Sequence, residues 1–448
     1  MDNATGSIRD WLTNSAFLRV IFISLVMLLL QIPITLISSQ VLERQTTKQQ
    51  AINDVTSKWG YAQEVYGPRL VVPYYKVSGW TTFDGEKKYN RTKHYASFLP
   101  ETLGITAKVE NETRYRGIFE VPLYQTQLTL SGKFNKPDFS NFGIDPKLIL
   151  WEQAELLVGV SDARGIRQQA YTDWNQKKIP FEPGLGTSDN TSSGFHVLLK
   201  DPFNTDTFTY QIELALNGSQ HLYLSPMGKN SNINIQANWP DPSFQGYKLP
   251  TKRNISEQGF SAQWDISSIS RGYPQAWLHD NFNVSKLDDA LVGVNFIAPV
   301  DSYRMTERSI KYVMLFLLFT FVTIWLIEVL VNVRVHLLQY LFVGLGMCLF
   351  YLLLLALSEH IEFIWAYIIA SMAVITMTGM YSKAILKKRK HSFVVTVGIT
   401  ALYIYLYTLL QEQNYSLLFG SIGVFSALAA VMYITRNIDW HNLSKKSY

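Results

Sequence analysis

Apolar residues gather at the two ends of the chain, and polar residues fill its middle. Roughly the first forty and roughly the last 140 residues are rich in apolar side chains. The roughly 270 residues between them are rich in Asn, Gln, Ser and Thr and contain many aromatic residues. This division is typical of a membrane protein that carries one large water-soluble domain.

Six apolar segments are long enough to cross a bilayer, because a hydrocarbon core about 30 Å thick requires about 20 residues of helix. The predicted transmembrane helices cover residues 20–38, 312–333, 338–357, 361–381, 393–410 and 417–435. Residues 1–19 and 436–448 form the two ends, and residues 39–311 form the water-soluble domain. The first apolar run is longer than a usual signal peptide, and Leu36 and Ile37 are poor positions for cleavage, so we expect an uncleaved anchor.

Basic residues in the short connections predict the orientation, because they concentrate on the cytoplasmic side of a membrane. They lie between the second and third segments, between the fourth and fifth, and next to both ends of the chain, at Arg9, Arg19, Arg334, Lys383, Lys387, Lys388, Arg389, Lys390, Arg436, Lys445 and Lys446. The connections "SEHIE" and "QEQNY" contain neither Lys nor Arg. We therefore expect both termini in the cytoplasm and the large domain outside.

The water-soluble domain begins with a helical pattern and continues with strand patterns. Ile52, Val55 and Trp59 recur at helical spacing, so the first helix should continue as a short amphipathic stem that ends at Gly60. Segments rich in β-branched and aromatic residues follow, including "RLVVPYYKV", "IFEVPLYQTQLTLSGKF" and "FTYQIELALNG". Apolar and polar residues alternate in "QLTLSGKF" and "INIQANW", which predicts sheets with one face in water.

Short polar and glycine-containing stretches divide the predicted strands. We interpret four of them as turns: Asn111-Glu112, Ser131-Gly132, Asn217-Gly218 and Gly228-Lys229-Asn230. Many short strands with few helical periods between them favour an antiparallel sandwich. The predicted fold is therefore an α+β membrane protein with six transmembrane helices and one large, mainly antiparallel, sandwich-like β domain between the first and second helices. Exposed edge strands in so large a domain also predict self-association or the addition of a partner strand.

Charge and cysteine content exclude several classes of protein. The formal net charge is +5, and the basic residues near helix ends serve membrane topology, so we expect no nucleic-acid partner. Cys348 is the sole cysteine, which excludes an intramolecular disulfide and any site with paired cysteines. His94, His196, His221 and His279 have no metal-ligand spacing. The sequence contains no HExxH, GxSxG or GxxxxGK motif, and we expect neither a cofactor nor catalytic residues.

One polar segment interrupts the apolar C-terminal region. Glu359, His360 and Glu362 lie in "ALSEHIEF", between the third and fourth predicted helices. One interpretation is a water-facing turn, and the other is a substrate, metal or proton site at the mouth of the helix bundle. Glu359 and His360 are sequence neighbours that diverge on a helix, so these residues cannot complete a metal site by themselves.

Glu328 is the carboxylate that lies well inside a predicted transmembrane segment. At 1.5 Å per residue it lies about 24 Å along the second segment from Tyr312, near the cytoplasmic border. Its side chain could reach water or the region of Arg334, or it could serve a proton or ion pathway.

Read as a whole, the sequence resembles the CreD family of bacterial inner-membrane proteins over nearly its full length. The segments that carry the resemblance are "YGPRLVVPY" (66–74), "LPETLGITAKVENETRYRGIFEVPLYQTQLTLSGKF" (99–134), "ELLVGVSDARGI" (155–166), "NWPDPSFQG" (238–246), "PQAW" (274–277), "ERSIKYVMLF" (307–316) and "QYLFVGLGMCLFYLLLLALSEHI" (339–361). The resemblance implies an inner membrane location, a periplasmic domain and a link to envelope integrity and stress tolerance under a two-component system. It carries over no catalytic or binding residue.

The sequence and the resemblance together favour a non-enzymatic envelope protein anchored in the lipid bilayer. Its periplasmic domain would bind a protein or another envelope component. A transporter or channel is the first alternative, although the predicted spans contain few polar residues along one face. A membrane-embedded enzyme that acts on an envelope precursor at the periplasmic interface is the second.

Overall fold

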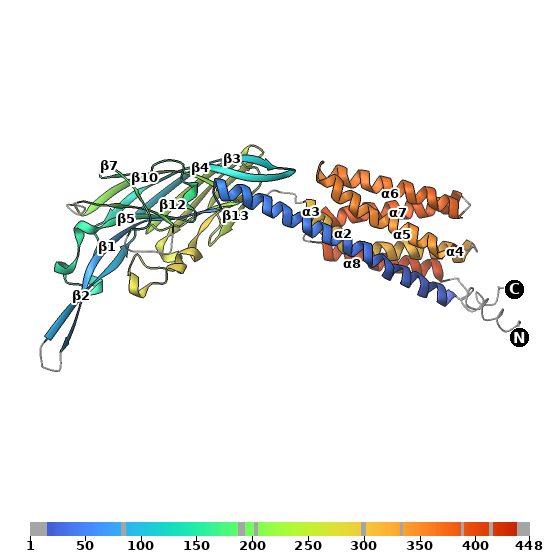
Figure 1. Ribbon diagram of the computed structural model, residues 1–448, viewed down its shortest axis with the longest axis horizontal. Coiled ribbons are helices and arrows are strands. Elements are labelled where there is room, and N and C mark those ends of the chain that lie inside the picture. The colour runs from blue at the N-terminus through green and yellow to red at the C-terminus, as the bar shows by residue number, and fades with distance from the viewer. Residues whose placement is uncertain are drawn as a thin grey trace. The chain divides into compact units, whose positions relative to one another are not determined.

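The computed structural model shown in Figure 1 describes residues 16–81, 87–186, 193–200, 205–296, 302–331, 335–386, 389–411 and 415–436. The chain forms two compact units. The first contains Met1–Lys48 and Val300–Tyr448, and the second contains Gln49–Pro299. Six of the basic residues used above to predict orientation lie outside the described residues: Arg9, Arg334, Lys387, Lys388, Lys445 and Lys446.

The first unit is helical. Its helices are α2 (Ala16–Trp59, which ends in the second unit), α3 (Ser302–Lys311), α4 (Val313–Val331), α5 (Leu337–Ser358), α6 (Phe363–Leu386), α7 (Arg389–Gln411) and α8 (Ser416–Thr435). Within the described residues, five helices are long and apolar enough to cross a membrane. The count becomes six if α3 and α4, which meet at a bend of 47°, form one span.

Helix α3 lies within the segment 39–311 that we assigned to the water-soluble domain, but it clusters with the other helices of the first unit. The sequence of α3 resembles a water-soluble segment because it contains the charged residues Arg304, Glu307, Arg308 and Lys311. Arg308 explains the placement, because its guanidinium donates hydrogen bonds to the carbonyl oxygens of Leu409 and Leu410 at 3.2 and 3.1 Å. These carbonyls belong to the C-terminal turn of α7, where a cation is favourable.

Helix α2 ends where the sequence predicts. Trp59 is its last residue, and Gly60 follows with a φ of 143°, a conformation that residues other than glycine rarely adopt. The indole of Trp59 donates a hydrogen bond of 3.3 Å to the carbonyl of Tyr124, and the guanidinium of Arg114 lies over its ring. The stem of α2 is thus packed against the β domain within the second unit.

The second unit contains two large sheets (Figure 1). The nine-stranded sheet contains β1 (Gln63–Thr81), β2 (Lys87–Phe98), β5 (Glu155–Val160), β8 (Glu182–Pro183), β9 (Gly194–Leu198), β11 (His221–Leu224), β13 (Pro242–Gly246), β16 (Ala276–Leu278) and β17 (Val292–Phe296). The eight-stranded sheet has the order β14-β15-β12-β3-β4-β10-β6-β7. Its strands are β3 (Thr102–Arg116), β4 (Phe119–Asn135), β6 (Tyr171–Trp174), β7 (Lys177–Pro180), β10 (Thr207–Ser219), β12 (Asn230–Ala237), β14 (Lys252–Ser256) and β15 (Gly259–Ser267).

Both sheets are mixed. Most neighbouring strands are antiparallel, as predicted, but β1 and β11 are parallel in one sheet and β3 and β12 are parallel in the other. A parallel pair needs a long crossover connection, because the chain must return to the same end of the sheet before it pairs. In each case the two strands are far apart in sequence, and no local sequence pattern predicts that they pair.

One hydrophobic cluster draws its residues from both sheets. It includes Leu70 of β1 and Val294 of β17 in the first sheet, and Leu130 of β4 and Trp264 of β15 in the second. The alternation predicted in "QLTLSGKF" is confirmed, because Leu128 and the apolar residues in step with it are buried while their polar neighbours face outward. Burial of one face therefore fixes which side of each strand points toward the core.

Three of the four predicted turns are wrong. Asn111-Glu112, Ser131-Gly132 and Asn217-Gly218 lie inside β3, β4 and β10, whereas Gly228 and Lys229 form a bend that leads directly into β12 at Asn230. Gly132 shows the physical reason. A Cβ atom there would lie 1.9 Å from the carbonyl oxygen of Thr102, so the glycine marks a close approach of chains and not a turn.

Candidate functional site

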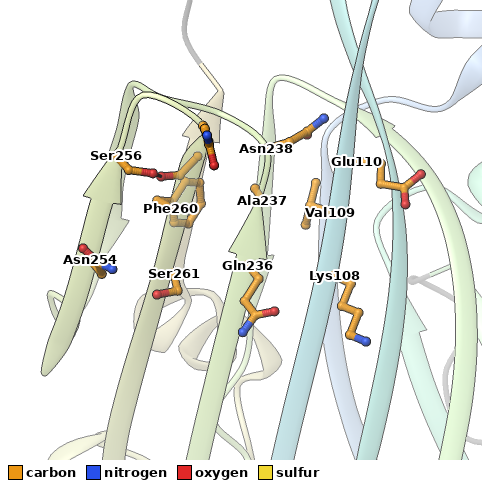
Figure 2. A pocket seen from close by; sticks show the side chains of 12 residues that line it. Lys108, Val109, Glu110, Gln236, Ala237, Asn238, Asn254, Ser256, Phe260 and Ser261 are labelled. Carbon is orange, nitrogen blue, oxygen red and sulfur yellow. Dashed lines mark hydrogen bonds between the residues drawn. The ribbon is translucent and has the colours of Figure 1, made fainter.

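A hollow lies on the outer face of the eight-stranded sheet, across β14, β15, β12 and β3 (Figure 2). Its volume is about 440 Å³, and we call it the sheet groove. It is lined by Lys108, Val109, Glu110, Gln236, Ala237, Asn238, Asn254, Ser256, Gln258, Gly259, Phe260 and Ser261. A second hollow of about 260 Å³ continues it along the same strands and shares Gln236, Asn254 and Ser261.

Neutral hydrogen-bonding groups dominate the sheet groove. Figure 2 shows the amides of Gln236 and Asn254 and the hydroxyl of Ser261 on neighbouring strands. The titratable groups of the lining are Lys108 and Glu110, which have opposite charges. Amide and hydroxyl groups both donate and accept hydrogen bonds, so this lining suits a neutral, polar ligand such as a glycan or a peptide backbone.

The sequence analysis missed the sheet groove. The alternating pattern predicts that Gln236 points away from the core. The polar residues of β14, β15 and β12, however, have the same pattern as any solvent-exposed face of a sheet, so they do not indicate a binding site. They become one site only because β3 pairs with β12 through a long-range parallel register, in which Lys108 lies opposite Gln236.

A second polar cluster lies on the nine-stranded sheet. The hydroxyl of Tyr66 lies 2.7 Å from Glu64 Oε2 and 2.8 Å from Asp288 Oδ1, and His221 Nε2 lies 3.6 Å from Glu64 Oε1. The imidazole of His221 is the main cause that holds the pKa of Glu64 below its usual value. Burial and the two carboxylates raise the pKa of Tyr66, so this phenol stays protonated. The cluster connects β1 and β11 with the segment Val284–Ala290.

The other histidines of the second unit make individual contacts. His94 Nδ1 lies 2.7 Å from Asp280 Oδ2, His279 Nε2 lies 2.7 Å from Ser97 Oγ, and His196 Nδ1 lies 2.8 Å from the carbonyl oxygen of Gly184. Among the residues that the structure describes, no group of three or more His, Cys, Asp or Glu side chains is arranged to hold a metal ion.

The structure separates the three residues of the "SEHIE" segment. Glu359 follows the last turn of α5, and its carboxylate accepts a hydrogen bond of 3.1 Å from the hydroxyl of Tyr303 and lies 3.4 Å from Arg44 Nε. Its side chain is only 9% exposed. His360 and Glu362 are exposed. The three groups therefore do not converge on one point.

Glu328 is buried, and Arg334 lies outside the described residues. Its carboxylate is ion-paired with Arg19. It also accepts hydrogen bonds of 3.0 Å from the hydroxyl of Tyr340 and 3.1 Å from the backbone N–H of Val335. Glu328 thus connects α4 with α2 and with the start of α5.

The arrangement of elements defines the class of protein. One long apolar helix precedes a domain of two large mixed sheets, and several apolar helices follow it, which is a multi-pass membrane protein with an inserted β domain. A family model described as inner membrane protein CreD matches residues 15–441. Over 419 residues, which are 93% of this chain and 92% of the relative, the chain is 33% identical to inner membrane protein CreD of Escherichia coli (strain K12). The chain belongs to the CreD family, and it is a multi-pass protein of the inner membrane.

Proposed function

We propose that this protein contributes to envelope integrity and stress tolerance by binding an envelope component without catalysis. The β domain lies on the periplasmic side, and the helices hold it at the inner membrane. The observation that carries the proposal is the sheet groove. Its amide and hydroxyl groups come from neighbouring strands and lie next to Lys108 and Glu110.

The chemistry of the groove supports binding over reaction. General acid–base and nucleophilic catalysis both need a titratable or nucleophilic group next to a matched partner. The twelve lining residues contain one carboxylate, one amine and two serines, with no histidine or cysteine. A ligand held by hydrogen bonds to amides and hydroxyls would be recognised by shape and polarity.

The periplasmic side is supported by the distribution of basic residues. Lys383, Arg389, Lys390 and Arg436 flank α6, α7 and α8 at ends that alternate with the uncharged connections. The positive-inside rule then favours cytoplasmic termini, and a single span before the β domain would carry that domain across the membrane.

The test is complementation of a strain that lacks this protein. Gln236→Ala combined with Asn254→Ala removes two amides from the sheet groove. Gln127→Ala combined with Gln211→Ala removes two exposed amides from β4 and β10 on the same sheet, outside the lining. All variants are expressed to the wild-type level, and survival under envelope stress is measured.

We expect the groove variant to lose tolerance and the control variant to retain it. Equal tolerance in both variants would reject the groove as the working surface. If, in addition, Glu359→Ala or Glu328→Gln failed to complement while still inserting, a transporter or a membrane-embedded enzyme would become the better explanation.

A further inference from the structure

The hairpin of β1 and β2 extends beyond the strands that support its base (Figure 1). Strands β5, β11 and β16 pair with β1 or β2 only between Gln63 and Val71 and between Ala96 and Phe98. Farther out, residues 75–81 and 87–93 pair only with one another. We call these two segments the arm.

The two faces of the arm differ in chemistry. Directly opposed residues of an antiparallel pair lie on the same face of the ribbon. The pairs Tyr75↔Lys93, Val77↔Arg91 and Gly79↔Tyr89 therefore share one face, which we call the mixed face. The pairs Lys76↔Thr92, Ser78↔Asn90 and Trp80↔Lys88 share the opposite face, which is polar except at Trp80 near the end of the pairing and which we call the polar face.

Apolar and cationic groups of the mixed face are open to the surroundings. Val77 is 41% exposed and Tyr89 is 67% exposed. Arg91 is exposed and forms no ion pair with any residue that the structure describes. Over residues 76–93 the sequence contains five basic and two acidic residues, a net charge of +3.

An isolated two-stranded ribbon is only marginally stable in water, so an arm with both faces exposed is expected to gain stability from a partner. The mixed face restricts the kind of partner. A soluble polyanion would attract Arg91 and Lys93, but it would leave Val77 and the ring of Tyr89 in water. A bilayer surface satisfies both, because tyrosine rings favour the headgroup region and basic residues are attracted to anionic headgroups.

We propose that the mixed face of the arm docks on the surface of a bilayer that contains anionic phospholipids. This inference is independent of the function proposed for the sheet groove, because it needs neither the groove nor its ligand.

The experiment uses the full-length protein reconstituted in phosphatidylcholine vesicles. Cys348 is buried, so a single introduced cysteine can be labelled selectively with an environment-sensitive fluorophore. Val77→Cys places the label on the mixed face, and Ser78→Cys places it on the polar face. The phosphatidylglycerol content is raised stepwise. Quenching of the fluorophore by lipids that carry a spin label near the headgroup is then measured. These lipids are placed either in the vesicles that hold the protein or in vesicles added afterwards.

We expect quenching at position 77 to rise with phosphatidylglycerol and to exceed that at position 78. Arg91→Gln should lower the ratio of docked to free arm about five-fold, the factor that one basic residue contributes at an anionic surface. Lys177→Gln removes the same charge from β7 and should leave the ratio unchanged. High salt should reduce the docking, because it screens exposed charges.

Equal quenching at the two positions, or quenching that does not depend on phosphatidylglycerol, would overturn the proposal. Protection of position 77 by soluble peptidoglycan fragments, in the absence of lipid quenching, would also overturn it in favour of an anionic polymer. Loss of tolerance in the groove variants would not change any of these outcomes, so the two proposals fail separately.

Discussion

The hydroxyl group of Tyr303 donates a hydrogen bond of 3.1 Å to the carboxylate of Glu359. This contact joins α3 to the C-terminal end of α5, although the two residues belong to helices that are not neighbours in sequence. Arg44 of α2 lies next to the same carboxylate. Glu359 therefore has a role in packing that its exposed neighbours His360 and Glu362 do not share.

This difference predicts unequal effects of three alanine substitutions. Glu359→Ala should destabilise the helical unit by about 1–3 kcal/mol, because it leaves the partners of a largely buried acceptor without a bond. His360→Ala and Glu362→Ala should change stability by less than about 0.5 kcal/mol, as usual for exposed positions. Unfolding of the purified protein in mixed micelles with a denaturing detergent measures all three. A loss of stability in His360→Ala as large as that in Glu359→Ala would contradict the packing role of Glu359.

The ion pair between Arg19 and the buried carboxylate of Glu328 predicts strong coupling. Arg19→Met should destabilise the protein by about 3–5 kcal/mol, because it leaves the buried carboxylate of Glu328 without its opposite charge. Glu328→Met should cost less, because the side chain of Arg19 is 28% exposed. The double variant should recover a large part of this loss, since no uncompensated charge remains. A double-mutant cycle on detergent unfolding measures the coupling. Additive losses would show that the two side chains act independently.

Asp162 predicts a pH-dependent contribution to stability. Burial raises the pKa of Asp162, but hydrogen bonds from Arg164 and from the backbone N–H of Tyr61 more than offset this effect and lower the pKa below its usual value. The stabilisation is therefore present above the unfolded-state pKa of about 3.9 and is lost as the pH falls through the lower folded-state pKa.

Asp162→Asn should destabilise the β domain near neutral pH by about 1–3 kcal/mol. The difference in the free energy of unfolding between wild type and variant should narrow as the pH falls below about 4. Thermal unfolding followed by circular dichroism at a series of pH values provides the measurement. Asp289→Asn, at an exposed position, is the control and should show no such difference. A difference that stays constant down to acidic pH would refute the linkage.

Gly132 predicts a steric penalty inside a strand. A Cβ atom there would lie 1.9 Å from the carbonyl oxygen of Thr102 and 2.8 Å from the hydroxyl of Tyr210, which is itself hydrogen-bonded to that carbonyl. Gly132→Ala should therefore destabilise the β domain by about 1–3 kcal/mol. Gly104→Ala is the matched control on β3, because its Cβ would meet Ser131 at an ordinary 3.5 Å. Similar unfolding temperatures for the two variants would contradict this explanation.

Local patterns in the sequence were enough to predict the long apolar helices and the alternating strands. A bilayer requires a long run of apolar residues, so hydropathy located the helices, and the i, i+3, i+7 spacing of Ile52, Val55 and Trp59 extended the first of them to Gly60. Alternation predicted the buried face of β4 and β12, because side chains alternate along every strand. This reasoning failed at α3, a charged helix whose Arg308 finds its partners on α7.

Contacts between distant residues were decided by the tertiary structure alone. Arg19 and Glu328 are 309 positions apart, and the parallel register of β3 with β12 brings Lys108 to Gln236 and so creates the sheet groove. Gly132 and Gly218 look like turn residues until the neighbouring strands are in place, when they prove to be points of close approach. The sequence by itself determined the long apolar helices and the apolar faces of the strands, since these depend on neighbours a few residues away. Pairing, register and the partner of each buried charge depend on the whole folded chain, and only the folded chain revealed them.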